Sequence, residues 1–428
     1  MMKLGGLAGR VGASVLGGRA SELVRSGPQK EIKRAENLVR NAVRVVETLG
    51  EMKGAAMKVG QMLSLQVGML PPEVAKVLRA LQQQAPRVPS EVMRYEVEGS
   101  LGAPIDELFA EFEEEAFAAA SIGQVHRGRM HDGRRVAIKI QYPLIREVVQ
   151  ADLKNLKTLM KSLFSMVFDA DFEPLWKEMH DVLLEELDYE HEAANMTRMR
   201  DLHADVPEIV IPRVIEELSS ERVLTMEYLE GISAEEACSS AFSQAARDRW
   251  GVVLFALEMR GLFEHRLMHA DPNLANFSFL EDGRIIVYDF GCLKKVPARV
   301  AVGYARLFLS ILEDRRVEVP DVLAAIGLVK ANGDPIDQAL IGPYIDLFAE
   351  ILREDPPYVF GEDEDLYQKI MDLGMANWTH ASDLRFPEDI IFIDRALAGH
   401  FGNLINLRAS GSWRKLIERY AQSALREG

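Results

Sequence analysis

Two long stretches of helical periodicity are separated by a segment whose residue pattern is typical of β-strands. Apolar positions recur at helical spacing over residues 29–84 and again from about Leu144 to Leu202. Between them lie three short runs of alternating or β-branched residues, Phe117–His126, Arg127–Met130 and Arg135–Gln141. The Asp132-Gly133 pair between the last two runs is a strong signal for a β-hairpin. This order predicts an α+β fold with a small antiparallel-sheet lobe between helical segments.

The second half of the chain is predicted to be mainly helical. Two further strands are expected at Ile209–Ile215 and Arg222–Tyr228, and helical periodicity dominates from Ser233 onward. One loop and hairpin region, His269–Leu293, contains a short buried strand at Ile285–Tyr288. We therefore expect four parts: a flexible segment at a membrane surface (1–28), a helical extension (29–105), a small lobe with inserted helices (106–230) and a helical lobe (231–428). Two lobes form a cleft, which is a common ligand site.

The composition excludes several classes of protein. A formal net charge of −16 argues against non-specific binding to nucleic acid, which needs a basic surface. The two cysteines, Cys238 and Cys292, cannot form a disulfide framework, and this fits a reducing compartment. No run reaches about 18 uninterrupted apolar residues, so we expect no transmembrane helix and a cytoplasmic protein.

The first 45 residues are basic in an otherwise acidic chain. They carry nine basic side chains (Lys3, Arg10, Arg19, Arg25, Lys30, Lys33, Arg34, Arg40 and Arg44) and three acidic ones (Glu22, Glu31 and Glu36), a difference of 9 − 3 = +6. Such a segment is able to bind peripherally to the anionic inner face of a membrane. A frayed soluble tail is the alternative.

Three motifs that carry chemistry follow one another along the chain. The strand Val136-Ala137-Ile138-Lys139 matches the kinase strand whose lysine neutralises the α- and β-phosphates of ATP. Asp271 is followed at the fifth position by Asn276, which is the spacing of the kinase catalytic loop. Asp289-Phe290-Gly291 comes directly after the predicted strand 285–288, where the metal-binding carboxylate of a kinase stands.

Each motif has an ordinary structural explanation when it is taken alone. A lysine on an apolar strand is usually a solvated edge residue, and an Asp-Pro turn with a capping asparagine is common. The three motifs occur in the required order and on the required elements, so their joint occurrence favours a bilobal protein-kinase-like fold. Asp271 would act on the nucleophile, while Asn276 and Asp289 would bind Mg²⁺, a hard cation that prefers oxygen ligands. Position alone places the adenine-binding hinge at Glu227 and Leu229.

Two features differ from ordinary protein kinases and resemble one family. The loop before the second strand is alanine-rich, with Ala118, Ala119, Ala120 and Ser121 where a glycine-rich loop would bind phosphates. The helical extension contains Lys58-Val59-Gly60-Gln61. Together they resemble the UbiB family of atypical kinases, which is marked by an alanine-rich loop and a Lys-x-Gly-Gln motif.

The resemblance implies further roles. Glu186 and Asp188 would meet the segment of Lys58 and Gln61 across the cleft and restrain ATP use, and Glu192 would pair with Lys139. On spacing alone, Glu147 competes for that lysine, and Glu185–Glu192 also has the pattern of a solvated acidic helix face. Asn273-Leu274-Ala275 replaces the His-Pro-Gly of many bacterial relatives, which is closer to the mitochondrial-type branch. The charged segment Ser412–Gly428 lacks the transmembrane hairpin that some bacterial members carry.

The resemblance also implies a function. It indicates an ATP-dependent ATPase or atypical kinase for a small or lipid-like molecule, with Mg²⁺ as cofactor and Mn²⁺ as the alternative. This enzyme would support the biosynthesis of ubiquinone or a related prenyl lipid at the membrane surface. Its partners would be a lipid or prenyl-quinone precursor, an anionic membrane and ubiquinone-biosynthesis enzymes, but no nucleic acid. A Ser/Thr protein kinase and a non-catalytic nucleotide-binding scaffold remain as alternatives.

Overall fold

The computed structural model describes residues 88–427 apart from internal gaps at 121, 152, 154–156, 158–160, 162–172, 353, 355–356, 362–368, 370–372, 374–383 and 386. The helices expected between residues 29 and 84, with Lys58 and Gln61, lie outside the described residues, as does Ser121. The described chain divides into two compact units. The sheet unit holds the residues up to Glu190 together with Ile215–Thr225, and the helical unit holds His191–Val214 and everything from Met226. The lobe boundaries expected from the sequence remain predictions.

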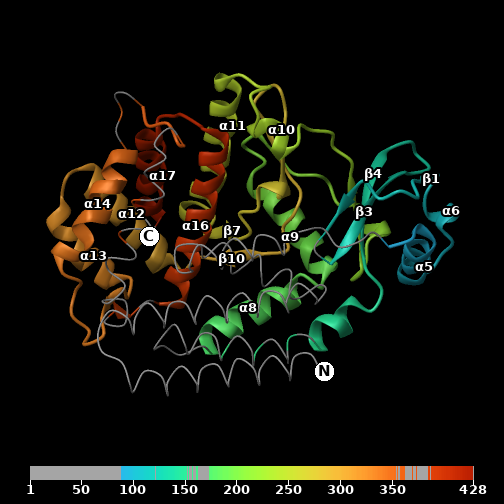
Figure 1. Ribbon diagram of the computed structural model, residues 1–428, viewed down its shortest axis with the longest axis horizontal. Coiled ribbons are helices and arrows are strands. Elements are labelled where there is room, and N and C mark those ends of the chain that lie inside the picture. Colours follow the sequence, from blue (N-terminus) through green and yellow to red (C-terminus); the bar gives the residue numbers. More distant parts are fainter. Residues whose placement is uncertain are drawn as a thin grey trace, which may run out of the picture. The chain divides into compact units, whose positions relative to one another are not determined.

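The sheet unit contains a five-stranded antiparallel sheet (Figure 1). Its strands run in the order β1-β3-β4-β6, and β2 pairs with β3 off this path: β1 (Glu111–Phe112), β2 (Ala118–Ala119), β3 (Gly123–Arg129), β4 (Arg135–Gln141) and β6 (Val223–Glu227). The expected β3–β4 hairpin is confirmed, and Gly133 takes the left-handed φ of +91° that its turn requires. The runs Phe117–His126 and Arg127–Met130 do not form two strands, because β3 crosses the boundary between them.

Helix α5 (Ser90–Leu101) covers one face of this sheet. Its fully buried Met93 and Val97 pack with Val136, Ile138 and Ile140 of β4 in one apolar core. This helix lies within the segment 29–105 that was expected to be helical, although no individual helix was predicted after residue 84. It begins after Pro89 and ends at Gly102, whose φ of +77° is the left-handed conformation that terminates many helices.

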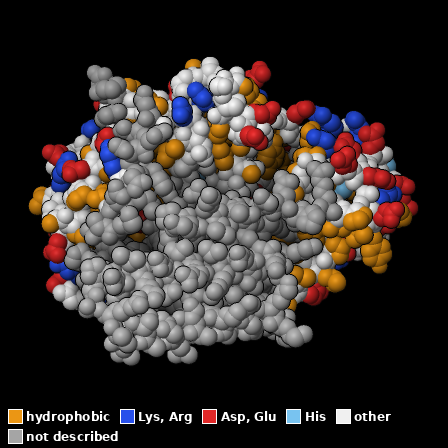
Figure 2. Space-filling view, in the orientation of Figure 1, with side chains coloured by type: hydrophobic (Ala, Val, Ile, Leu, Met, Phe, Trp, Pro, Cys, Tyr) orange, Lys and Arg blue, Asp and Glu red, His pale blue; other side chains and the backbone are white. Residues whose placement is uncertain are grey.

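Ion pairs line the exposed edge of the β3–β4 hairpin, where acidic and basic side chains are interspersed (Figure 2). Arg129 Nε lies 3.0 Å from Glu111 Oε2, and Arg134 Nε lies 2.7 Å from Asp132 Oδ2. Exposed pairs of this kind contribute about 0–1 kcal/mol each. The stability of the sheet therefore comes mainly from its buried face against α5.

Long helices form most of the helical unit: α11 (Gln244–Phe263), α12 (Ala298–Leu312), α14 (Gln338–Ile351), α16 (Glu388–Leu407) and α17 (Trp413–Glu427). Helix α11 packs against α16, and α12 packs against α17, as the ribbon shows (Figure 1). Nearly the whole circumference of α11 is buried between residues 250 and 263, so it is the central helix of this unit. The N-cap Ser243 begins α11 by accepting a hydrogen bond from the N–H of Ala246.

Three small sheets accompany these helices. Strand β7 (Leu267–His269) pairs with β10 (Leu293–Lys295), and β8 (Phe277–Phe279) pairs with β9 (Ile285–Val287), which confirms the expected short strand. Two pairings were not foreseen: β5 (Ile209–Val210) joins β9 in parallel, and β11 (Val329–Lys330) pairs with β12 (Leu384–Arg385). Both join residues distant in sequence through strands too short to show alternation.

Among the described residues, no helix is both long enough and apolar enough to span a membrane.

Two glycines on helices provide a test of packing in the helical unit. A Cβ on Gly303 of α12 would lie 1.9 Å from Cγ2 of the buried Ile326, whereas a Cβ on Gly342 of α14 would meet nothing within 4 Å. Gly303→Ala is expected to lower the free energy of unfolding by about 1–3 kcal/mol because the core is overpacked. The control Gly342→Ala should raise it by about 0.5–1 kcal/mol, because alanine favours the helix. Urea denaturation followed by circular dichroism measures both, and equal effects would contradict the packing described here.

Candidate active site

The strand β7 and a short capped turn carry the predicted catalytic loop. Asp271 comes two residues after the end of β7, and its Oδ1 accepts a hydrogen bond from the N–H of Asn273 at 3.2 Å. Asn273 in turn caps the 3₁₀ turn Leu274–Asn276. The side-chain amide of Asn276 donates back to the carbonyl oxygen of Asp271 at 3.5 Å. The five-residue spacing of Asp271 and Asn276 is therefore the length of one closed local turn.

The second predicted metal-binding residue lies in the adjacent loop. Strand β9 ends at Val287, and the N–H of Tyr288 donates to the carbonyl oxygen of Asn276 at 3.0 Å. Asp289 follows, with its Oδ1 accepting from the N–H of Gly291 at 3.0 Å. The backbone thus sets Asp289 next to the turn that carries Asn276.

Two more hydrogen bonds join these loops from the other side. The imidazole Nε2 of His269 lies 2.6 Å from the carbonyl oxygen of Asp289, and the N–H of Ala270 donates to the carbonyl oxygen of Cys292 at 2.9 Å. His269 is buried, with 2% of its surface exposed. The helical unit therefore brings the loops of Asp271, Asn276 and Asp289 into one constellation.

Helix α9 (Tyr189–Leu202) places the predicted Glu192 beside this constellation. The side-chain amide of Asn195 donates to the carbonyl oxygen of Phe290 at 3.0 Å, which fixes the helix to the Asp-Phe-Gly segment. A Cβ on Gly291 would lie 3.9 Å from Oε2 of Glu192. Glu192 is 1% exposed, so it is not part of a solvated acidic helix face.

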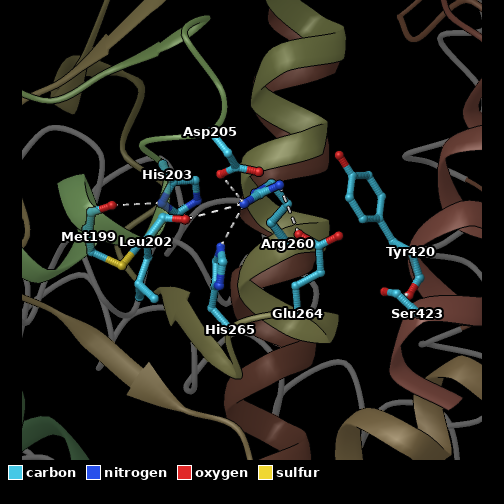
Figure 3. Close-up of polar contacts among 9 residues, drawn as sticks. All are labelled: Met199, Leu202, His203, Asp205, Arg260, Glu264, His265, Tyr420 and Ser423. Carbon is cyan, nitrogen blue, oxygen red and sulfur yellow. Dashed lines mark hydrogen bonds and ion pairs between the residues drawn. The ribbon is translucent and has the colours of Figure 1, made fainter. Parts of the chain in front are cut away.

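A buried arginine holds the other end of α9 (Figure 3). The guanidinium of Arg260, on α11, donates to the carbonyl oxygen of Leu202 at 3.3 Å and to Asp205 Oδ1 at 2.7 Å. It also lies 3.2 Å from His265 Nε2 and 3.0 Å from Glu264 Oε2. These contacts connect the end of α9 to the central helix, and with Asn195 they fix the direction of α9 past Glu192.

The lysine predicted to bind the nucleotide belongs to the sheet unit. Lys139 lies opposite Val125 in the β3–β4 hairpin and is 7% exposed. Its Nζ stands 4.9 Å from the ring centroid of Tyr189, which is a cation–π distance. Gln141, the last residue of β4, holds the end of the strand: its side-chain amide donates to the carbonyl oxygen of Leu187 at 3.0 Å. A buried ammonium on a rigid strand is suited to contact anionic groups.

The alanine-rich loop is a closed turn. Ala118 and Ala119 form β2 and pair with Val125 and Gln124 of β3, and the N–H of Ala120 donates to the carbonyl oxygen of Gly123 at 2.9 Å. A Cβ on Gly123 would lie 2.1 Å from the carbonyl oxygen of Ile140, so only glycine fits there. The N–H of Ala120 is thus engaged inside the loop, unlike the phosphate-binding N–H groups of a glycine-rich loop.

Gln124 connects this loop to the start of the described chain. Its side chain accepts from the N–H of Val88 at 3.1 Å and donates to the Val88 carbonyl oxygen at 3.3 Å. Its amide nitrogen also lies 2.8 Å from Nε2 of His126, whose Nδ1 lies 2.8 Å from the carbonyl oxygen of Glu113. Burial lowers the pKa of His126, which fits a neutral ring that accepts at Nε2 and donates at Nδ1.

The structure also places the predicted hinge residues, two predicted regulatory residues and Glu147. The carbonyl oxygen of Leu229 accepts from the hydroxyl of Tyr288 at 3.0 Å, while Glu227 is exposed at the end of β6. Glu186 and Asp188 lie in the turn between α8 (Glu173–Glu185) and α9. Glu147, the competitor for Lys139, is exposed.

The donor set is compatible with a magnesium ion. No group of three or more His, Cys, Asp or Glu side chains suited to a metal occurs in the described part of the chain. A kinase-type site does not need such a group, because one carboxylate and one asparagine oxygen suffice when the phosphates of ATP supply further oxygens. Asn276 directs its amide nitrogen to the carbonyl of Asp271, an orientation that leaves its Oδ1 facing away from that carbonyl. Asp289 and Asn276 therefore fit a hard cation.

Comparison with known proteins decides the family. The model of the ABC1 atypical kinase-like domain matches residues 80–322. The chain belongs to this family. The match confirms the resemblance that the motifs indicated, and with it the kinase-like α+β fold.

Relatives and a solved structure agree with this. COQ8B, a mitochondrial atypical kinase of Rattus norvegicus, is 36% identical over 88% of this chain and 71% of its own length. The mitochondrial atypical kinase coq-8 of Caenorhabditis elegans is 30% identical over 98% of this chain. A solved structure of Rv3197 from Mycobacterium tuberculosis, in complex with erythromycin, matches with a TM-score of 0.67 and 28% identity over 91% of this chain and 98% of its own. The chain spans 58% of the length of coq-8 and 41% of Danio rerio COQ8B.

Several residues of this ABC1-family site were missed by sequence reasoning. Asn195, Gln124 and Arg260 each hold a predicted segment through a contact to residues far along the chain. Asn195 lies three residues after Glu192 on the same helix face, and that spacing was the one available signal. Nothing in the sequence indicates the partners of Gln124 or Arg260.

Low pH should weaken the contacts of Arg260 that hold the end of α9, because His203 lies beside them. Burial lowers the pKa of this ring, which lies among Arg260, Asp205 and His265, from 6.5 to about 4. The folded state therefore favours the neutral ring, and the stability this provides is complete above pH 6.5 and is lost as the pH falls through about 4. For a difference of 6.5 − 4 = 2.5 pH units, the loss approaches about 3 kcal/mol. His203→Gln should remove this part of the pH dependence of the free energy of unfolding.

Urea denaturation at pH 7 and at pH 4.5 measures the effect. His131→Gln, at an exposed ring on the β3–β4 turn, is the matched control and should leave the pH dependence of the wild type. If His203→Gln and the wild type lose equal stability between the two pH values, the buried neutral ring is not a source of acid sensitivity.

Proposed function

We propose that this ABC1-family protein is a Mg²⁺-dependent ATPase or phosphotransferase whose metal-binding and nucleophile-orienting groups come from the helical unit. The observation that carries the proposal is the hydrogen bonding between the two loops: His269 to Asp289, and Tyr288 to Asn276. Phosphoryl transfer needs alignment and charge neutralisation more than covalent chemistry by the protein. Loops fixed to each other by backbone carbonyls are suited to that task.

Asp271 orients the attacking hydroxyl or water and accepts its proton. Its carboxylate is itself held by the N–H of Asn273, which limits its rotation. Asp289 and Asn276 would hold the metal ion through oxygen atoms, with Mn²⁺ as a substitute for Mg²⁺. When bound, such an ion would supply charge neutralisation for the phosphate oxygens.

Lys139 contacts the α- and β-phosphates, and Glu192 is its partner. Burial supports this pairing over the alternative, because Lys139 and Glu192 are both almost fully buried while Glu147 is exposed. The ring of Tyr189 lies under the ammonium of Lys139. Tyr189 precedes Glu192 by three residues on α9, and residues three positions apart share a helix face. An unpaired buried charge is costly, which favours two buried opposite charges as partners.

The substrate is proposed to be water or a small lipid-like molecule. The names of the relatives, mitochondrial atypical kinases of the COQ8 type, support a role in the biosynthesis of ubiquinone or a related prenyl lipid. The basic segment 1–45 supports a location at an anionic membrane surface, with prenyl-quinone precursors and ubiquinone-biosynthesis enzymes as partners.

A second candidate is a Ser/Thr protein kinase. One relative, 32% identical over 62% of this chain, carries the name probable serine/threonine-protein kinase abkA in Dictyostelium discoideum. Robust phosphorylation of peptides in trans, lost in Asp271→Asn, would favour this candidate.

The first test separates nucleotide binding from turnover. Asp289→Asn should lower ATPase activity by about 100-fold or more, because a neutral amide replaces the metal-binding carboxylate. Asp271→Asn should lower kcat while leaving the affinity for Mg-ATP nearly unchanged. Hydrolysis is measured as phosphate release with and without vesicles containing anionic lipid, and affinity by titration with a fluorescent ATP analogue. Binding with no hydrolysis under any metal or lipid condition would leave only the scaffold.

The second test concerns restraint of the site. The N–H of Ala120 is engaged inside the alanine-rich loop, and Gln124 holds the residue at which the extension with Lys58 joins the described chain. Ala119→Gly should loosen the loop and change nucleotide affinity, and Lys58→Arg should change the balance of ATP hydrolysis and autophosphorylation. Both are measured by nucleotide titration and by ³²P incorporation. Unchanged affinity and kinetics in both variants would contradict the proposed restraint.

A further inference from the structure

Helix α16 contacts the catalytic loop through three residues, Gly399, His400 and Asn403. The side-chain amide of the buried Asn403 donates to the carbonyl oxygen of Pro272 at 2.8 Å. A Cβ on Gly399 would lie 2.2 Å from Cγ of Pro272, so the backbone of the helix touches the loop directly. Nε2 of His400 lies 3.3 Å from the carbonyl oxygen of His269, and the ring is 5% exposed.

A buried glutamate of α11 stands behind His400. Oε2 of Glu258 lies 3.1 Å from Nε2 of His400, and Glu258 is 2% exposed. The carboxyl oxygens have no hydrogen bond of good geometry among the described residues, since the ring nitrogen is also directed to the His269 carbonyl. Burial raises the pKa of Glu258 well above its ordinary value and lowers that of His400 to about 3. His400 is therefore neutral near pH 7, and burial favours the protonated form of Glu258.

The contacts define a chain of donors and acceptors. A neutral His400 that carries its hydrogen on Nε2 donates to the carbonyl oxygen of His269. His269 then donates through its own Nε2 to the carbonyl oxygen of Asp289. The chain runs from His400, whose ring lies against Glu258 of the central helix, to both loops of the site. A buried polar group with an incomplete set of hydrogen bonds costs free energy, so a role in the site explains this arrangement better than stability does.

We propose that His400, seated against Glu258, is a positioning residue that fixes the loop of Asp271 relative to Asp289. The proposal rests on the proposed function of these two carboxylates. His400 acts on the carbonyl of His269, two residues before Asp271, and His269 acts on the carbonyl of Asp289 itself. A shift of the catalytic loop of about 1 Å is enough to slow a reaction that depends on alignment by about 100-fold.

Two substitutions at the same position separate positioning from packing. His400→Gln keeps an N–H donor near the position of Nε2, and His400→Leu fills a similar volume without any donor. His203→Leu is the matched control: His203, 2% exposed, is buried like His400 and also contacts a backbone carbonyl, that of Met199 at 2.9 Å, but it touches neither loop of the site. Thermal denaturation of all three variants measures the stability that each one loses.

Amide hydrogen exchange without nucleotide provides the direct readout. His400→Leu should accelerate exchange in residues 269–276 and 289–293, while His203→Leu and His400→Gln should leave these segments at the wild-type rate. Kinetically, His400→Leu should lower kcat by about 10- to 100-fold, with the KM for ATP within about 2-fold of the wild type. His400→Gln should recover most of kcat.

The two kinds of failure are distinguishable. If wild-type protein shows no ATP turnover, the proposed function fails, and the exchange experiment still tests the positioning. Equal exchange in the two loops for His400→Leu and His203→Leu would overturn the proposal, as would a loss of kcat in His400→Gln as large as in His400→Leu.

Discussion

The imidazole of His269 lies 2.6 Å from the carbonyl oxygen of Asp289, and the rest of the candidate site depends on this contact. It crosses between two loops that leave different strands, β7 and β9, and it is buried, where a hydrogen bond is stronger than in water. The pairing of β7 with β10 and of Ala270 with Cys292 makes the crossing rigid. Without it, only backbone bonds at the ends of the loops, Ala270 to Cys292 and Tyr288 to Asn276, would join the segments that carry the two carboxylates.

The parts of the site that the sequence predicted are those made by local structure. Asp271 and Asn276 belong to one turn closed by its own side chains, so their spacing is a property of about six residues. Lys139 lies on a hairpin whose Asp-Gly turn and alternating strands are also local signals. The order of these segments, together with Asp289-Phe290-Gly291, was sufficient to indicate a kinase-like fold, and the alanine-rich loop and Lys58-Val59-Gly60-Gln61 indicated the family that the comparison then confirmed.

The parts that the sequence did not predict are contacts across long distances in the chain. His400 touches the carbonyl of residue 269, and Gln124 holds Val88, through pairs separated by 131 and 36 positions. A lone histidine or glutamine on a helix or strand has many possible environments, and periodicity does not distinguish among them. The bounds of helix α5 within the predicted helical extension were not found for a related reason. Its apolar side is narrow, with Met93 and Val97 as its only fully buried residues, and the exposed Tyr95 breaks the pattern.

The two units divide the proposed work unequally. The groups assigned to the metal ion and the nucleophile all come from the helical unit, where α11 and α16 support them from behind and α9 is attached at both Asn195 and Arg260. The sheet unit contributes the lysine and a loop whose Ala120 N–H is already engaged. Regulation is easier to impose on the groups of the sheet unit. A loop with few buried contacts changes conformation at lower cost than the catalytic loops, which are held from three sides. Gln124 holds Val88, the first described residue, at that more adjustable side, and a restraint on ATP use that acts there would leave the catalytic loops undisturbed.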